Sequence, residues 1–136
     1  MNHGPTRRAR PPNTPAESIF GYAQAVKAGA TIYVAGQLSH DEESNFIHPG
    51  DFAAQAKQTF VNLDKVLAHF GATRKQIVQD TVFVVNLHEH LDAVASSHVE
   101  YFGDHRPATT GLSVDGLVFP GQLFEINVVV DTRLDA

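Results

Sequence analysis

One segment of the sequence constrains the fold more than any other. Between residues 51 and 70, apolar side chains recur at steps of three and four positions, the spacing of one face of an α-helix. Asp51 is a suitable N-cap, and Gly71 suits the left-handed position that follows a helix. The apolar stripe, which we expect to pack on a β-sheet, consists of Phe52, Ala56, Phe60, Leu63, Val66, Leu67 and Phe70. The opposite face is predicted to be exposed to solvent and carries Gln55, Lys57, Gln58 and Lys65.

Runs rich in β-branched residues lie on both sides of this helix. Before it, such residues flank Gly29, which predicts two short strands around a turn. After it, Val82 to Val85 is apolar throughout, which is typical of a strand covered on both faces. The strands are predicted at residues 25–27, 31–35, 77–85, 108–114 and 123–130.

A second helix is predicted over residues 91–102, with one face made of Leu91, Val94, Ala95, His98 and Phe102. The order of elements is then β-β-α-β-α-β-β, which predicts an α+β sandwich in which two helices cover one face of one sheet. The other face needs cover as well, so we expect a homo-oligomer. Residues 1–17 contain four prolines and three arginines and are predicted to be an extended or mobile tail, leaving 18–136 as a single domain.

Composition excludes several classes of function. The 136 residues include no cysteine, which excludes disulfides, zinc–thiolate sites and a cysteine nucleophile and suits a cytoplasmic location. A net charge of −5 without a concentrated basic face argues against a nucleic-acid partner, and no apolar run is long enough to span a membrane. The start has no apolar segment of a secretory signal. The i,i+2 spacing of His88 and His90 differs from that of zinc-binding pairs, and no phosphate loop is present, so we expect neither a metal nor a cofactor.

Six segments in order resemble the YjgF/Rid family, also described as reactive intermediate deaminases or endoribonuclease L-PSP. Together they cover about residues 19–131. The matching segments are 21–26 (Gly-Tyr-Ala-Gln-Ala-Val), 34–37 (Val-Ala-Gly-Gln), 51–63, 80–87, 101–102 with 107–108, and 124–126 (Phe-Glu-Ile). The resemblance implies a chorismate-mutase-like fold and a homotrimer whose ligand clefts lie between subunits. It also implies a deaminase-type hydrolase of the enamines and imines that pyridoxal-phosphate-dependent dehydratases release.

The resemblance also assigns site residues, and some of them differ from the family pattern. The family arginine that binds the substrate carboxylate is replaced by Thr109, which is followed by Thr110. A cleft serine is replaced by Ala35, and an asparagine by Ala95. The family residues that remain are Tyr22, Gly36 and Glu125. Thr109 cannot replace the bidentate charge of an arginine, so we predict a neutral or differently charged ligand. Arg106 precedes Pro107 and is expected in the turn rather than in the cleft.

Glu125 also has support from the residues alone. Phe124, Ile126 and Val128 alternate with it, so its carboxylate is expected on the opposite face of the sheet. With the resemblance, Glu125 becomes the predicted catalytic residue, in a ligand cleft formed with Tyr22, Ala35, Gly36, Thr109 and Thr110. Burial in that cleft is expected to raise its pKa. Two functions stay open: a deaminase or hydrolase with altered specificity, and a non-catalytic metabolite-binding or regulatory module on the same trimer.

Overall fold

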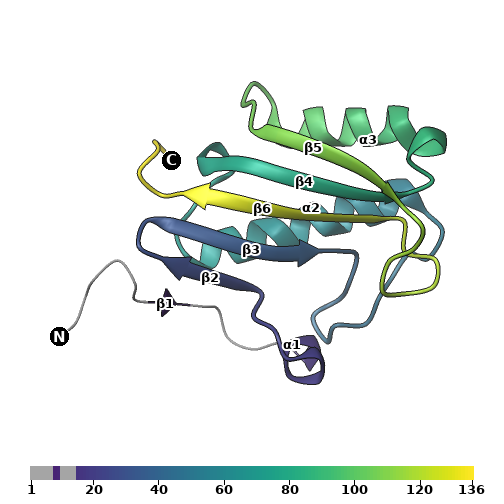
Figure 1. The fold of residues 1–136 in the computed structure, drawn as a ribbon, viewed down its shortest axis with the longest axis horizontal. Helices are drawn as coiled ribbons and strands as arrows, with labels where there is room; N and C mark the ends of the chain where they lie inside the picture. Colours follow the sequence, from purple (N-terminus) through teal and green to yellow (C-terminus); the bar gives the residue numbers. More distant parts are fainter. Residues whose placement is uncertain (1–7, 10–14) are drawn as a thin grey trace.

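A computed structural model describes residues 8–9 and 15–136 and contains one mixed six-stranded sheet (Figure 1). Its strands are β1 (Arg8–Ala9), β2 (Ala25–Ala28), β3 (Thr31–Gln37), β4 (Ile77–Val85), β5 (Ala108–Val114) and β6 (Phe124–Asp131). They lie in the order β1-β2-β3-β6-β4-β5, and β4 and β5 form the parallel pair while the other neighbours are antiparallel. The predicted α+β order is confirmed, with β1 and a short helix, α1 (Pro15–Phe20), preceding it.

Helix α2 (Phe52–His69) forms as its apolar stripe predicts. The Asp51 side chain accepts a hydrogen bond from the backbone N–H of Ala54 at 3.1 Å and caps the helix. Gly71 follows with a φ of 67°, a conformation that costs little for glycine. Five stripe residues are buried, and Val66 and Phe70 pack partly buried against the same core. Burial of this face holds α2 against the sheet.

One residue of the face of α2 that is predicted to be exposed to solvent is instead completely buried. Gln55 has no exposed surface, because its side chain reaches the loop that precedes β6. Its Nε2 donates to the carbonyl oxygens of His48 and Gly121 at 2.8 and 2.9 Å, and its Oε1 accepts from Leu123 N–H at 2.8 Å. Three hydrogen bonds compensate for burying one amide, so the prediction of an exposed Gln55 is wrong.

Helix α3 (Leu87–Phe102) begins four residues earlier than predicted. Asn86 adopts a left-handed conformation, with φ 58° and ψ 55°, and the chain turns directly from β4 into the helix. The earlier start changes which residues face the core: Leu87, Val94 and Tyr101, seven residues apart, pack there. Leu91 is 51% exposed and Ala95 is also exposed, so their predicted place on the apolar face is wrong.

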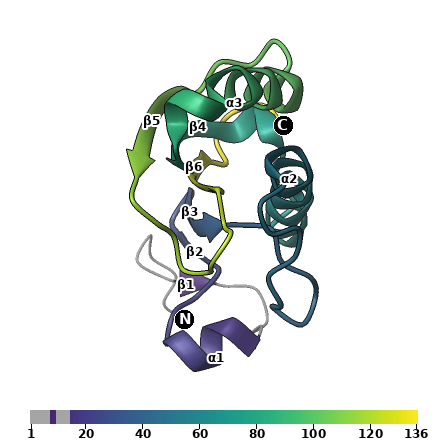
Figure 2. The ribbon, with the colours of Figure 1, turned by 90° about the vertical axis from the view of Figure 1, so that its right-hand side faces the viewer.

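The two faces of the sheet differ in what covers them. Figure 2 shows α2 and α3 on one side of the sheet, and among the described residues no helix packs on the other side. Along β6, Phe124, Ile126, Val128 and Val130 are buried under the helices, and the residues between them are partly exposed on the open face. The open face carries Tyr33 and Leu112, which are 54% and 42% exposed. An open, partly apolar face is what the sequence predicts for one subunit of an oligomer.

The segment predicted as a tail is described only in part. Arg8 and Ala9 pair with β2, and residues 15–17 form the first half of α1. The rest of the prediction for 1–17 lies outside the described residues. Glu17 is buried, and its Oε1 accepts a hydrogen bond from Gln24 N–H at 3.0 Å, which holds α1 to the segment before β2. None of the helices in residues 15–136 has the length and apolar content to cross a membrane.

Candidate functional site

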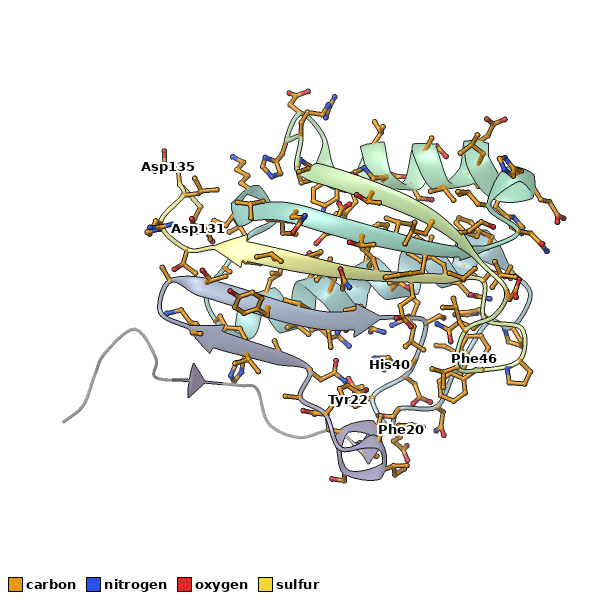
Figure 3. The ribbon with its side chains drawn as sticks, viewed as in Figure 1. Phe20, Tyr22, His40, Phe46, Asp131 and Asp135 are labelled. Atoms are coloured by element: carbon orange, nitrogen blue, oxygen red, sulfur yellow. The ribbon has the colours of Figure 1, made fainter. Side chains whose placement is uncertain are left out.

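A largely apolar cavity of about 400 Å³ lies where β3 ends and β6 begins. Its walls come from α1, the segment after α1, the end of β3, the loop that leads to α2, the loop before β6, and Glu125 of β6. Figure 3 shows Phe20, Tyr22, His40 and Phe46 together at this end of the molecule. Four of the predicted cleft residues, Tyr22, Ala35, Gly36 and Glu125, line this cavity.

Glu125 is the carboxylate of the cavity. Its side chain lies on the opposite face from Phe124 and Ile126, as the alternation predicts. Burial raises its pKa, and a hydrogen bond donated by Gln122 Nε2 to Oε1 at 3.3 Å opposes that rise. A carboxyl group with a raised pKa exchanges protons closer to neutral pH, which suits a general acid or base.

Gly36 leaves the space that the Glu125 carboxyl group occupies. A β-carbon added at Gly36 would overlap Oε2 of Glu125 and lie 2.6 Å from its carboxyl carbon. The register of β3 and β6 shifts between Val34 and Gln37, which brings Gly36 under the carboxyl group. Absence of a side chain at Gly36 therefore permits the position of Glu125.

Tyr22 contributes a neutral phenol to the same cavity. Burial is the largest cause that raises the pKa of Tyr22, and the nearby carboxylates of Glu17 and Glu125 raise it further. Its hydroxyl oxygen accepts a hydrogen bond from Gln24 Nε2 at 3.4 Å. The phenol stays protonated around neutral pH and keeps an O–H with which to donate to a ligand.

The loop before β6 forms one wall of the cavity, and two glutamines position it. Phe119 lines the cavity and stacks on Phe46 with ring centroids 5.5 Å apart and planes 1° apart. The Gln122 side chain is buried. Its Oε1 accepts a hydrogen bond from Phe119 N–H, and its Nε2 donates one to Oε1 of Glu125. Gln122 therefore links this wall to the Glu125 carboxyl group. Gln55 holds the same loop to α2. Sequence reasoning missed these contacts, and nothing in the local pattern of glutamine indicates them.

Thr109 and Thr110 do not line this cavity within one chain. Thr109 pairs with Asp80 of β4, whereas Glu125 pairs with Phe83. Three residues along a strand and two strand spacings separate Thr109 from Glu125 by about 14 Å. Thr109 Oγ1 lies 3.3 Å from Nε2 of His98 on α3, on the helix side of the sheet, and Thr110 is exposed on edge strand β5.

Among the described residues that line the cavity, His40 is the one basic side chain. The described residues that line it include neither lysine nor arginine. Arg106 lies in the turn before β5, as predicted, where its guanidinium donates to the carbonyl oxygens of Gly103 and His105. In residues 15–136 no three histidine, aspartate or glutamate side chains gather as metal ligands, and His90 stacks on Phe52 instead.

Comparison with known proteins places these features in context. A family model described as Endoribonuclease L-PSP matches residues 13–132. The chain is 33% identical over 116 residues to 3-aminoacrylate deaminase RutC of Acinetobacter baylyi, covering 85% of this chain and 90% of that protein. It is 32% identical over 112 residues to 2-iminobutanoate/2-iminopropanoate deaminase of Rattus norvegicus, covering 82% and 80%. A crystal structure from Mycobacterium tuberculosis, described as a member of the YjgF/YER057c/UK114 family, superposes with a TM-score of 0.79 at 28% identity, covering 92% of this chain and 99% of that one.

Proposed function

This chain belongs to the YjgF/Rid family, which the Endoribonuclease L-PSP model describes, and on that premise we propose that it deaminates a small uncharged imine or enamine. The reaction takes place in the cavity bounded by Tyr22, Gly36 and Glu125. The relatives named as deaminases of 3-aminoacrylate and 2-iminobutanoate support the reaction type. The absence of lysine and arginine from the described cavity wall supports the uncharged substrate and is the observation that carries this proposal.

The chemistry is hydrolysis of a carbon–nitrogen double bond. Water adds to the imine carbon, and the carbinolamine that forms loses ammonia to leave a carbonyl compound. Glu125 holds the water and exchanges protons with the reacting atoms, which its raised pKa favours. The Tyr22 hydroxyl donates a hydrogen bond to the substrate.

The charge of the substrate distinguishes the proposed reaction from that of the 2-imino acid deaminases. A substrate carboxylate in this cavity would lie beside Glu125 with no lysine or arginine from the described wall to balance it. Thr109 offers a hydroxyl, and a neutral hydrogen bond contributes about 0.5–1.5 kcal/mol where a charged one contributes about 1.5–3. A substrate without a carboxylate places no second negative charge beside Glu125, and it does not need the stronger hydrogen bond of a charged partner.

The working form of the protein is proposed to be a homotrimer with each ligand cleft at a subunit boundary. Support comes from the partly apolar open face of the sheet and from Thr109 and Thr110, which lie away from the Glu125 cavity of their own chain. A neighbouring subunit that brings its β5 to the cavity mouth would complete the cleft. No nucleic acid or membrane is proposed as a partner.

The test compares two imines generated in the reaction vessel. A monoamine oxidase forms the uncharged imine of benzaldehyde from benzylamine, and an amino-acid oxidase forms 2-iminobutanoate from 2-aminobutanoate. Semicarbazide traps the imine that remains. A slower formation of the trapped product in the presence of the protein therefore measures how much imine the protein has hydrolysed. We expect the uncharged imine to be hydrolysed at least about tenfold faster in kcat/KM, since about 1.4 kcal/mol of lost charge pairing corresponds to tenfold.

The variant Glu125→Gln is expected to lower kcat by about 10²–10⁴-fold, the usual contribution of a general acid or base. Glu100→Gln, which changes an exposed carboxylate of α3 outside the cavity, is the matched control and should leave kcat unchanged. Equal or faster hydrolysis of 2-iminobutanoate would contradict the uncharged substrate. A ligand that raises the melting temperature but is never consumed would favour the binding module instead.

A further inference from the structure

His40 belongs to the cavity wall, and no role has been assigned to it so far. It comes from the loop between β3 and α2 and lines the same cavity as Glu125 and Tyr22. It also borders a second, more open cavity of about 510 Å³, where the charged or titratable side chains are Asp41, Glu42, Lys65 and His69. The imidazole therefore stands between the Glu125 cavity and the more open second cavity, a position from which it can exchange protons with both.

The hydrogen bonds of the ring define which nitrogen is free. Nδ1 of His40 lies 2.8 Å from the carbonyl oxygen of Asp41. A carbonyl oxygen only accepts, so Nδ1 carries the proton, and the neutral ring has its lone pair on Nε2. This arrangement is the one that a general base requires, because the hydrogen bond at one nitrogen orients the ring and leaves the other nitrogen to accept.

The loop around His40 is held rigidly enough to keep this geometry. Asp41 Oδ1 accepts hydrogen bonds from the backbone N–H groups of Glu43 and Asn45 at 2.9 and 3.0 Å, which closes a tight turn. Asn62 of α2 donates from Nδ2 to the carbonyl oxygens of Leu38 and His40 at 2.8 and 3.1 Å. The backbone on both sides of the imidazole is therefore tied to the turn and to α2.

The other polar side chains of the cavity suit this role less well. Tyr22 has a raised pKa and stays protonated around neutral pH. Ser44 Oγ is engaged as the acceptor of Ala16 N–H at 3.2 Å. Among the described lining residues, His40 alone carries an imidazole, which can donate a hydrogen bond from one ring nitrogen while the other accepts.

We propose that His40 is a catalytic residue that acts with Glu125 as a pair of proton carriers in the hydrolysis. As water adds, its oxygen bonds to the imine carbon and His40 Nε2 takes the proton that the water loses. The electron pair of the carbon–nitrogen double bond moves to nitrogen, which takes the proton of the Glu125 carboxyl group.

The second half of the reaction restores both groups. The hydroxyl proton of the carbinolamine moves to the Glu125 carboxylate as the carbonyl forms. The carbon–nitrogen bond breaks, and protonated His40 gives its proton to the nitrogen, which leaves as ammonia. One imine and one water become one carbonyl compound and one ammonia, and neither residue is changed.

The inference rests on the proposed deaminase function, and one variant isolates the imidazole. In His40→Asn, the side-chain amide can still donate to the Asp41 carbonyl oxygen, but no acceptor remains at the place of Nε2. With the benzaldehyde imine we expect kcat to fall by about 10²-fold or more and KM to change by less than about threefold. The acidic limb of the pH profile of kcat is expected to disappear.

His69→Asn, which changes a histidine of the second cavity only, is the matched control and should keep the wild-type kcat and pH profile. A His40→Asn variant with a kcat within about threefold of the wild type and an unchanged profile would overturn the proposal.

A second measurement does not need turnover, so a failure of the proposed function can be told from a failure of this inference. In ¹⁵N NMR spectra of the wild type at pH 8, we expect His40 to show a protonated Nδ1 and an unprotonated Nε2. Benzamide, an uncharged ligand whose N–H groups can donate, is expected to shift the Nε2 resonance, whereas benzoate is not. A protonated Nε2 in the neutral ring, or no response to benzamide, would overturn the assignment of His40 even if the wild type hydrolyses no imine.

Discussion

At the scale of single residues, the contact between Gly36 and Glu125 makes a sharp test of the site. In Gly36→Ala the new methyl group would overlap the carboxyl group, so Glu125 has to turn out of the cavity. We expect kcat for the uncharged imine to fall by about 10²-fold or more, with a loss of about 1–2 kcal/mol in the free energy of unfolding. Enzyme kinetics and urea denaturation measure the two effects.

Gly116→Ala is the control for that substitution. A β-carbon at Gly116 meets no atom within 4 Å, and the backbone there does not need a positive φ. This variant should match the wild type in both measurements. A Gly36→Ala protein with full activity would mean that the observed position of the Glu125 carboxyl group is not the one that hydrolyses the substrate.

Residues in regular strands could be predicted better than residues in loops. The face on which Glu125 lies follows from the two-residue period of a strand, and Tyr22 and Gly36 follow from the family resemblance. His40 lines the cavity from a turn that Asn62 holds, and Gln122 contacts Glu125 from a loop that Gln55 holds, so both positions depend on hydrogen bonds made far along the chain. No short-range pattern encodes such contacts, so their role required the folded structure.

At the scale of elements, the joint between α2 and the loop before β6 depends on one side chain. Gln55→Ala would leave the carbonyl oxygens of His48 and Gly121 and the N–H of Leu123 without this partner in a buried place. The backbone N–H groups of Asp51 and Gly50 still donate to the carbonyl oxygens of His48 and Gly121, so Leu123 N–H is the group left unsatisfied. We expect a loss of about 1–3 kcal/mol in the free energy of unfolding, the usual cost of one unsatisfied buried group, measured by urea denaturation.

Gln58→Ala on the same helix is the comparison, since the Gln58 side chain is only half-buried and donates a 2.9 Å hydrogen bond from Nε2 to Oδ1 of Asn62. Its expected cost is below about 1 kcal/mol. Equal losses in the two variants would show that Gln55 contributes no more than an ordinary surface glutamine.

The boundaries of α2 and α3 show why one helix was predictable and the other only in part. Asp51 and Gly71 are common cap residues, and they mark the ends of α2 correctly. The start of α3 depends on Asn86 in a left-handed conformation, which allows the chain to enter the helix directly from β4. A single asparagine is a weak signal, so the apolar period alone placed the start at Leu91.

At the scale of the whole molecule, the open face of the sheet gives the proposed trimer a direct test. Leu112 lies on edge strand β5 and pairs with Phe83, on the same face as Glu125. We expect Leu112→Asp to dissociate the trimer by burying a charge in the subunit contact. Light scattering coupled to size-exclusion chromatography should report about three times the 14.8 kDa chain mass for the wild type and a lower mass for the variant.

Leu91→Asp provides the control, because Leu91 is similarly exposed but belongs to α3 on the other side of the sheet. Its mass should equal that of the wild type. A wild type that elutes as a monomer, or a trimer that withstands Leu112→Asp, would contradict this arrangement. In the proposed trimer, the distance between Thr109 and Glu125 within one chain means that the composition of the cleft would depend on how the copies meet, which one sequence does not encode.

The position of α1 has a practical consequence for anyone who prepares this protein. Ala16 and Phe20 of α1 line the Glu125 cavity, so a purification handle fused directly to Pro15, in place of the residues ahead of α1, would sit beside the cavity wall. The C-terminus lies at the opposite end of the sheet from α1 (Figure 1). A handle placed there leaves the cavity wall unaltered, and samples that differ only in which end carries it would reveal whether an added peptide competes with small molecules.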